Sequence, residues 1–307
     1  MRSAPSFRKP RALRRGDRVA VIAPAGPFDR ASFEAGLAIL QRRYSVGFDP
    51  TLFDRHRYLA GSDSRRLDEL RSALGDPGIR ALFCARGGYG TMRLLPQLAD
   101  AIDSASAADL KPLVGFSDIT GLHQWLQQQG VVSVHGPVVT QLGRQPASTC
   151  ERLFSLLEST APAAPLEGSS TYVGGAAEGP LIGGNLTMLS QLLGTPFLPP
   201  LDGAILLLED VGERPYRLDR MWTHLALAGV FHRVRGLVLG SFNACEEQDS
   251  GYTSAEVLRE LAMETGLPCA AGFAIGHSEV NEPVPLGVRV RLDADRHRLE
   301  FLEPATA

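Results

Sequence analysis

The sequence predicts an α/β protein built on a parallel sheet that helices cover on both faces. In the first half, short apolar segments alternate with segments of helical spacing, and most of the apolar segments run into turns that contain Gly or Pro. The chain has 307 residues, of which 44% are hydrophobic and 21% charged, an ordinary globular composition. No apolar run approaches the length of a bilayer span. At this length we expect two domains, each with its own core.

The first half supplies strands and helices in turn. A β-branched segment before Pro24 is typical of a buried strand, and the stretch after it has the spacing of an amphipathic helix. Strands are expected at residues 18–23, 80–84, 113–115 and 131–134, and helices at residues 28–43, 62–74 and 119–129.

The domain boundary is expected where the composition changes. Residues 161–179 are rich in Pro, Ala, Gly and Ser, which is typical of a linker or a mobile surface segment. Residues 1–160 would then form the first domain and residues 180–307 a smaller second one. In the second domain we expect helices at 185–193 and 216–228, strands at 204–208, 237–239 and 272–275, and a terminal hairpin at 287–302.

Charge and cysteine content disfavour several classes of binding partner and site. With 31 Lys+Arg against 34 Asp+Glu the net charge is −3, so the chain has no global basic field for nucleic acid or an anionic membrane. The four cysteines form no CxxC pair, which disfavours a zinc ribbon or a dithiol redox motif. The basic start of the chain is followed by an apolar stretch that ends at Pro24, too short for an export signal. We expect a cytoplasmic protein that acts on a small molecule or another protein.

Ser117 is the candidate nucleophile. It stands where a predicted strand passes abruptly into a helix, a geometry that exposes a hydroxyl and directs amide N–H groups to the same point. Gly115 lies two residues before it, but Ile119 replaces the usual Gly two residues after it. The alternative is a serine that only caps the helix.

Two histidines could serve as the base. His277 is the best placed of seven, because it follows a predicted strand in the loop 276–281. His135, which ends another strand before Gly136 and Pro137, is the second choice.

A carboxylate is also needed, to fix the tautomer of the base. Glu209 ends the apolar run 204–208, so its side chain must be exposed at the rim of the sheet or paired. Asp210 and Glu213 on the same loop are alternative candidates for this carboxylate. The non-catalytic alternative is that the carboxylate forms a salt bridge to a nearby Arg.

The glycine-rich loop 86–90 follows a predicted strand. Its backbone amides suit an oxyanion or a phosphate, although such loops are common. It lacks the Gly-Lys-Ser/Thr ending of a P-loop and the spacing of the dinucleotide fingerprint, so nucleotide binding of those kinds is disfavoured.

Taken together, these segments resemble the LD-carboxypeptidase family of serine peptidases, which includes muramoyltetrapeptide carboxypeptidases and microcin C immunity peptidases. The resemblance spans nearly the whole chain and depends on the number and order of its motifs. These are residues 21–27 (VIAPAGP), 85–90 (ARGGYG), 114–120 (VGFSDIT), 135–137 (HGP), 183–186 (GGNL), 208–210 (LED), 216–220 (YRLDR), 276–277 (GH) with Asn281, and 285–287 (PLG).

The resemblance implies a flavodoxin-like or amidotransferase-like N-terminal domain and a C-terminal domain with a β-barrel-like sheet. It implies a Ser-Glu-His triad of Ser117, Glu209 and His277, without a metal or cofactor, and a homodimer. The oxyanion hole would use the amides of Asp118 and Gly88. Arg86 is the candidate partner for the terminal carboxylate of the substrate.

The activity implied is hydrolysis of the L,D-amide bond before a C-terminal D-amino acid in cytoplasmic murein tetrapeptide. Same-chemistry cleavage of a peptidyl-nucleotide antibiotic is the alternative, and an aromatic platform for the base would favour it. Trp125 and Trp222 both fall in predicted helices, outside the variable segment 141–179, which favours murein peptide. An ordinary α/β-hydrolase lacks support, because the His-Gly-Gly-Gly motif and the second Gly of the elbow are missing. A flavodoxin-like phosphate-binding module is the non-enzymatic alternative.

Overall fold

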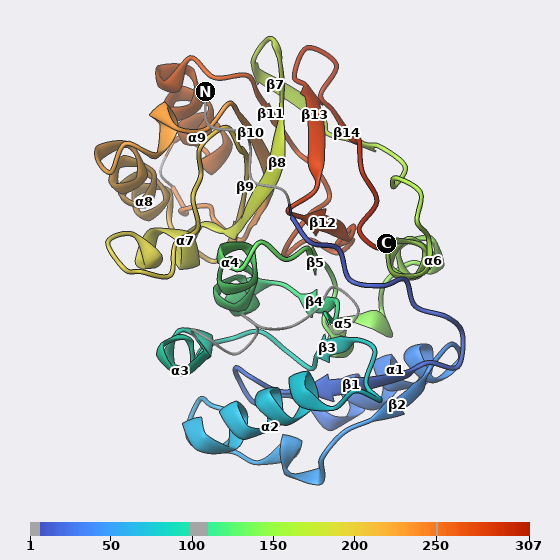
Figure 1. Ribbon diagram of the computed structural model, residues 1–307. Helices are drawn as coiled ribbons and strands as arrows, with labels where there is room; N and C mark the ends of the chain where they lie inside the picture. The colour runs from blue at the N-terminus through green and yellow to red at the C-terminus, as the bar shows by residue number, and fades with distance from the viewer. Residues whose placement is uncertain (1–6, 99–109, 250) are drawn as a thin grey trace.

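The fold contains two sheets that lie one above the other, with helix α4 (Thr120–Gln128) between them (Figure 1). The computed structural model describes residues 7–98, 110–249 and 251–307. Within these residues no helix combines the length and the apolar character that crossing a membrane requires.

The first sheet has the strand order β12-β5-β4-β3-β1-β2. The five strands from the first half of the chain are parallel, and β12, which comes from far along the chain, joins β5 in the antiparallel sense. The parallel sheet predicted from the buried apolar runs is therefore confirmed. The strands are β1 (Arg18–Ile22), β2 (Ser45–Gly47), β3 (Leu82–Cys84), β4 (Leu113–Gly115), β5 (Ser133–His135) and β12 (Val284–Leu286).

Helices cover both faces of this sheet because alternate strand residues are apolar on both sides. Val19 and Val21 of β1 share a core with Phe33 and Leu40, whereas Ile22 belongs to a second core on the other face. The first core holds α1 (Arg30–Gln41), α5 (Val139–Leu142) and α6 (Ala147–Glu158), and the second holds α2 (Asp63–Gly75), α3 (Leu95–Leu98) and α4.

The second sheet is a curled, half-barrel-like sheet with the order β6-β14-β13-β8-β9-β10-β11-β7. Its central strands β8 to β11 are parallel and its outer pairs are antiparallel. The strands are β6 (Leu166–Glu167), β7 (Ser170–Val173), β8 (Ala176–Asn185), β9 (Ile205–Val211), β10 (Gly236–Asn243), β11 (Cys269–Ala271), β13 (Arg289–Asp293) and β14 (Arg298–Phe301). Helices α7 (Leu186–Leu192), α8 (Pro215–Leu227) and α9 (Ser254–Thr265) pack on one face.

Two segments differ from the sequence-based expectation. The stretch 161–179, predicted as a linker or mobile segment, contains β6, β7 and the start of β8. It pairs through β6 with β14 and through β7 with β11, so distant partners supply its order. The strand expected at 272–275 instead occupies Cys269–Ala271, because Gly272 adopts φ +78° and ends it.

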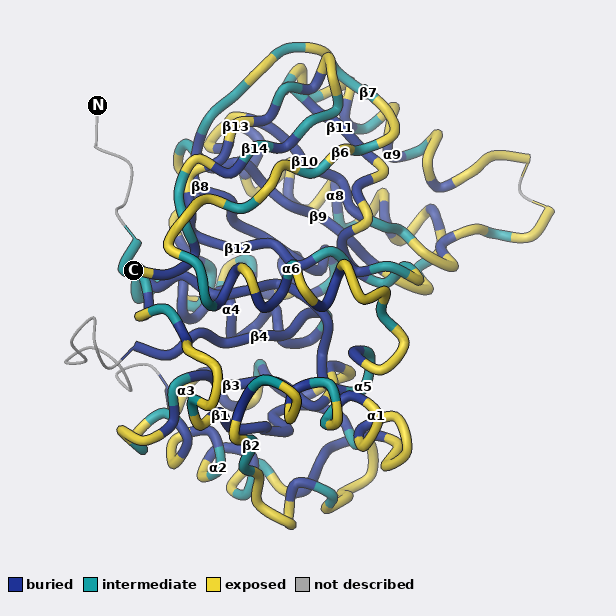
Figure 2. Tube along the Cα trace, turned by 90° about the vertical axis from the view of Figure 1, so that its right-hand side faces the viewer, coloured by how far each residue is buried: buried dark blue, intermediate teal, exposed yellow. Residues whose placement is uncertain are grey.

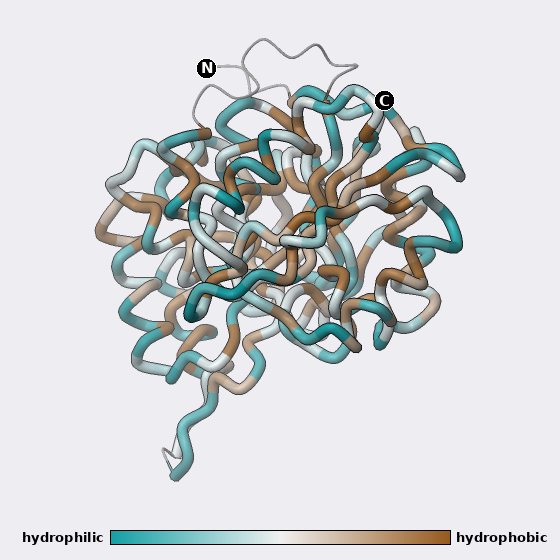
Figure 3. Tube along the Cα trace, turned by 90° about the horizontal axis from the view of Figure 1, so that it is seen from below, coloured by the Kyte–Doolittle hydropathy of each residue, from teal (hydrophilic) through white to brown (hydrophobic). Residues whose placement is uncertain are grey.

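Helix α4 joins the two sheets. Every residue from 120 to 127 is buried, and the helix lies in the buried middle of the molecule (Figure 2). The Gln124 side chain donates to the Gly183 carbonyl at 2.9 Å, and the Asn185 amide donates to Thr120 Oγ1 at 3.1 Å. The described residues between β10 and α9 instead project from the body as a hydrophilic arm (Figures 2 and 3).

Candidate active site

The site forms where neighbouring parallel strands end. β3, β4 and β5 lie side by side, and their carboxyl ends lead into the glycine-rich loop, Ser117 and His135 respectively. Ligand sites in open α/β sheets commonly lie at this edge. The second sheet contributes Glu209 from β9 and His277 from the loop after β11.

Ser117 begins the short 3-10 helix η3 (Ser117–Ile119) with φ +65°, a left-handed conformation that is rare for a residue with a side chain. Such a conformation costs on the order of 1–3 kcal/mol and is concentrated at functional sites. Asp118 fixes the turn: its carboxylate accepts the Thr91 amide at 2.9 Å and its carbonyl accepts the Thr91 hydroxyl at 2.6 Å. Burial raises the pKa of this carboxyl group.

The glycine-rich loop touches the serine. A Cβ on Gly87 would lie 2.7 Å from the Cβ of Ser117 and 3.0 Å from its Oγ, so the contact requires glycine. The Gly87 carbonyl accepts the Gly26 amide at 3.0 Å, which ties the loop to the turn after β1. Gly88, whose amide is one of the two predicted oxyanion donors, is exposed and has φ +107°.

Arg66 binds the backbone of the glycine-rich loop and of the turn after β1. Its guanidinium is fully buried and donates to the Gly90 carbonyl at 2.9 Å and to the Pro24 carbonyl at 2.5 Å. Asp63 pairs with the Nη2 atom of Arg66. The buried guanidinium therefore ties the glycine-rich loop to the turn after β1, and its partner carboxylate, Asp63, is partly exposed.

Glu209 and His277 form a hydrogen-bonded pair. His277 Nδ1 donates to Glu209 Oε2 at 2.6 Å, the Glu209 side chain is buried, and 15% of the His277 side chain is exposed. The loop is shaped for this contact, since a Cβ on Gly276 would lie 2.3 Å from Glu209 Oε2. Asn281 holds the same loop by accepting the Gly276 amide at 2.8 Å.

Glu209 is ionised and fixes one tautomer of His277. Burial tends to raise the pKa of Glu209, but the imidazoles of His135 and His277 on either side of the carboxylate lower it to about 2. With the Nδ1 proton of His277 directed at this carboxylate, Nε2 is left free to accept a proton. The His277 ring lies 4.6 Å, between ring centroids, from that of Phe116, the residue before Ser117.

His135, the second-choice base, is fully buried and lies on the other side of Glu209. Its Nε2 is 3.9 Å from Glu209 Oε1. His123 has a different environment, because its ring nitrogens lie 2.9 Å from Ser133 Oγ and 2.8 Å from the Gly115 carbonyl. Burial lowers the pKa of His123 to about 3.

The remaining predicted residues lie around this centre. Arg86 is exposed and donates to the Pro27 carbonyl. Asp210 is bound by Asn185 at 3.0 Å and by the Thr187 amide at 2.9 Å. Glu213 forms a surface ion pair with Arg217.

Sequence reasoning missed two features. One is the contact of Gly87 with Ser117, although the neighbouring Gly88 is a predicted site residue. The other is an exposed aromatic pair, Tyr58 and Tyr89, whose ring centroids are 5.5 Å apart. Tyr89 follows Gly88 in the loop, so a search for tyrosine as well as tryptophan in the loop would have found it.

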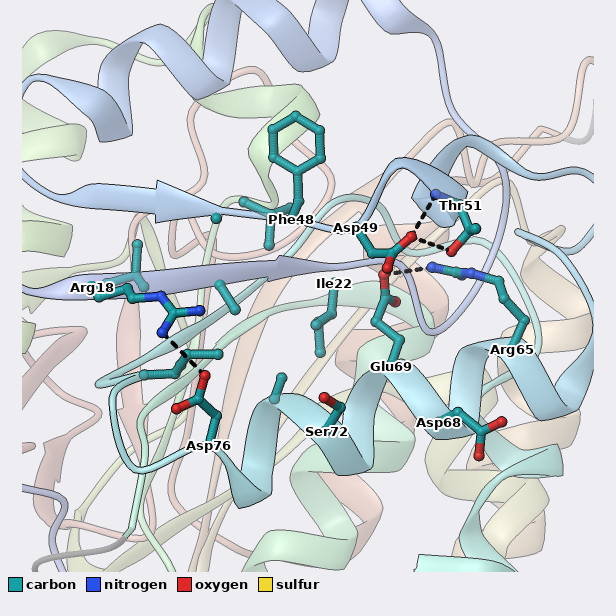
Figure 4. Close-up of a pocket in the computed structure, with 16 residues that line it drawn as sticks. Arg18, Ile22, Phe48, Asp49, Thr51, Arg65, Asp68, Glu69, Ser72 and Asp76 are labelled. Atoms are coloured by element: carbon teal, nitrogen blue, oxygen red, sulfur yellow. Dashed lines mark hydrogen bonds and ion pairs between the residues drawn. The ribbon is translucent and has the colours of Figure 1, made fainter.

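A cleft of about 600 Å³ lies away from this centre, between β1 and α2 (Figure 4). None of Ser117, Glu209 and His277 lines it. Glu69 on its wall accepts the Ala23 amide at 2.7 Å and pairs with Arg65 at 2.5 Å. These contacts fix the end of β1 and the turn that follows.

Among the described residues, no group of three or more His, Cys, Asp or Glu side chains is placed to hold a metal ion.

Comparison with known proteins identifies the class. Residues 19–136 match the LD-carboxypeptidase N-terminal domain and residues 178–292 match the LD-carboxypeptidase C-terminal domain. The chain belongs to the LD-carboxypeptidase family and is a hydrolase of that type.

Among its relatives, the murein tetrapeptide carboxypeptidase of Pseudomonas aeruginosa is 36% identical, over 92% of this chain and 94% of that protein. The crystal structure of muramoyltetrapeptide carboxypeptidase from Oxalobacter formigenes is similar, with a TM-score of 0.82, 29% identity and coverage of 92% and 97% of the two chains. The structure of MccF in complex with glutamyl sulfamoyl guanosine shares the fold, with a TM-score of 0.88, 22% identity and coverage of 98% and 100%.

Proposed function

We propose that this protein is a serine peptidase that hydrolyses the L,D-amide bond before the C-terminal D-amino acid of murein tetrapeptide. The observation that carries the proposal is the 2.6 Å Glu209–His277 pair beside the strained Ser117 turn. The similarity to the murein tetrapeptide carboxypeptidase of Pseudomonas aeruginosa supports the substrate.

In the proposed reaction His277 Nε2 takes the Ser117 proton as Oγ bonds to the substrate carbonyl carbon. The amides of Gly88 and Asp118 stabilise the oxyanion. The C–N bond then breaks, and His277 gives its proton to the departing amine of the D-amino acid. Water, deprotonated by His277, releases the acyl group from Ser117. Glu209 holds the imidazole throughout and stabilises its charged form.

Substrate selection is proposed to involve Arg86. An exopeptidase must bind the terminal carboxylate, and the exposed Arg86 at the start of the glycine-rich loop fits that need. The proposed chemistry uses no metal or cofactor.

The proposed setting is the cytoplasm, with a homodimer as the working form. The four cysteines Cys84, Cys150, Cys245 and Cys269 are free and buried, which suits a reducing compartment. The dimer rests on the family resemblance alone, and neither nucleic acid nor a membrane is an expected partner.

Mass spectrometry of murein tri-, tetra- and pentapeptides incubated with the protein tests this function. We expect loss of one D-Ala from the tetrapeptide, and no loss with Ser117→Ala, which keeps the fold because only a hydroxyl is removed. A rate for Ser117→Ala above about a thousandth of the wild-type rate would exclude Ser117 as nucleophile. Labelling of the wild type, but not of Ser117→Ala, by a serine-directed fluorophosphonate would separate an enzyme from a phosphate-binding module.

One observation favours the alternative substrate, a peptidyl-nucleotide. Trp125 and Trp222 are buried, but Tyr58 and Tyr89 are 56% and 46% exposed, so both rings offer a surface on which a base could stack. If this pair serves a base, Tyr58→Ala and Tyr89→Ala will raise the KM for an aminoacyl sulfamoyl nucleoside about tenfold or more. The KM for murein tetrapeptide should stay unchanged.

A further inference from the structure

Glu209 has one oxygen that no described residue binds. Oε2 accepts His277 at 2.6 Å, whereas Oε1 is buried and has no hydrogen-bond partner among the described residues. Asp210, the next residue, is held differently, since Asn185 and Thr187 bind both of its oxygens. A buried carboxylate oxygen without a donor is costly, so its surroundings are informative.

The group opposite this oxygen is His135. Its Nε2 lies 3.9 Å from Glu209 Oε1, and both of its ring nitrogens are also buried without a hydrogen-bond partner among the described residues. The backbone of His135 is fixed in β5, where it pairs with Gly115 of β4 and with Val284 of β12. Two unsatisfied groups of complementary chemistry thus face each other, about 1 Å beyond the usual hydrogen-bond distance.

We propose that His135 is a positioning residue for the catalytic acid and donates its Nε2–H to Glu209 Oε1 during turnover. This inference rests on the proposed function, in which Glu209 orients His277. A carboxylate held only by the base that it orients can rotate with that base. A second donor on the opposite oxygen fixes the carboxylate independently of His277.

The donor also sets how strongly Glu209 attracts the charged form of His277. The ionisable groups around His135 are Glu209 on β9, His277 beyond it, and His123 on α4 at 6.2 Å between ring centroids. A hydrogen bond to Oε1 draws negative charge away from Oε2. Loss of this donor leaves more negative charge facing His277, which favours the protonated imidazole and moves the acidic limb of kcat/KM to higher pH.

The test compares His135→Phe, which keeps a ring without a donor, with His135→Gln, whose amide nitrogen can reach the place of Nε2. For His135→Phe we expect kcat to fall about ten- to hundredfold with KM nearly unchanged, the range for a hydrogen bond to a charged group. The acidic limb should rise by about half a pH unit. His135→Gln should restore most of both.

His123→Phe is the matched control, because it removes a second buried imidazole that faces Ser133 and Gly115 instead of Glu209. It should lower stability and leave the acidic limb in place. The inference would be overturned if His135→Phe kept the wild-type kcat and the wild-type acidic limb of kcat/KM. It would also be overturned if both His135 variants lost kcat equally while the acidic limb did not move.

If His135→Phe does not fold, nitrogen NMR of histidine-labelled wild-type protein decides. We expect the proton of His135 on Nε2; an Nδ1–H tautomer would refute the inference, because an unprotonated Nε2 cannot donate to a carboxylate. Turnover by Ser117→Ala would instead refute the proposed function, independently of the results for the His135 variants.

Discussion

Gly87→Ala tests the closeness of the glycine-rich loop to the candidate nucleophile. Gly87 does not have a positive φ, so alanine causes no backbone strain and adds only a methyl group. That methyl would lie 2.7 Å from Ser117 Cβ and 3.1 Å from the Phe116 carbonyl, where ordinary contacts begin at 3.4 Å. The loop and the serine must therefore separate by about 0.7 Å, the difference between 2.7 and 3.4 Å.

A shift of this size moves Gly88, whose amide is one of the two proposed oxyanion donors, away from Ser117. Misplacement by about 1 Å costs on the order of a hundredfold, so we expect kcat/KM to fall about a hundredfold, or about 2.7 kcal/mol. Overpacking should also lower stability by about 1–3 kcal/mol.

The assay is D-Ala release from murein tetrapeptide, with circular dichroism to show that the fold is retained. Gly75→Ala is the matched control, because a Cβ added there would meet no described atom within 4 Å, and it should keep wild-type activity. If folded Gly87→Ala keeps more than about a third of wild-type kcat/KM, the glycine-rich loop does not position the site.

Three further predictions concern Glu209, the buried His123 and the loop that carries His277. Glu209→Gln should lower kcat about a thousandfold or more, whereas Glu213→Gln, which breaks only a surface ion pair, should be nearly silent; steady-state kinetics that showed the reverse would exchange their roles. Burial holds the pKa of His123 at about 3, below its usual 6.5, so the unfolded chain binds more protons between these values and stability falls as pH drops from 6.5 toward 3. Urea unfolding at pH 7 and pH 5 should show a smaller loss for His123→Gln, by up to about 2 kcal/mol, and equal losses would contradict this. Asn281→Ala frees the Gly276 amide and should lower kcat about tenfold with KM unchanged in the same kinetic assay, while a change in KM alone would place Asn281 in substrate binding.

The local pattern of apolar residues is sufficient to predict the parallel sheet and the ends of its strands. Strands buried on both faces are continuous apolar runs, and an abrupt end of such a run marks the edge at which Ser117 lies. Glu209 is a candidate because a carboxylate at the end of an apolar strand needs a partner, and the structure pairs it with His277. The chemistry of single residues is enough for that inference, without tertiary information.

Features that depend on distant pairing were not predictable in the same way. β6 and β7 are short, partly exposed and surrounded by Gly, Ser and Pro, so their sequence is typical of a linker until β14 and β11 lie beside them. The approach of Gly87 to Ser117 and of His135 to Glu209 also depends on how separate strands meet. From the sequence, His135 and His277 are alternatives for one task, whereas the structure places both rings around one carboxylate.

The pairing of β12 with β5 has a consequence for protein synthesis. The first sheet takes its last strand from Val284–Leu286, so a ribosome must make most of the chain before the edge of β5 is covered. Until then that edge is open to chaperones or to other nascent chains. His135 itself pairs with Val284, and His277 is added only shortly before it. A chain interrupted before residue 277 therefore carries Ser117 without the Glu209–His277 pair, and so lacks the proposed base.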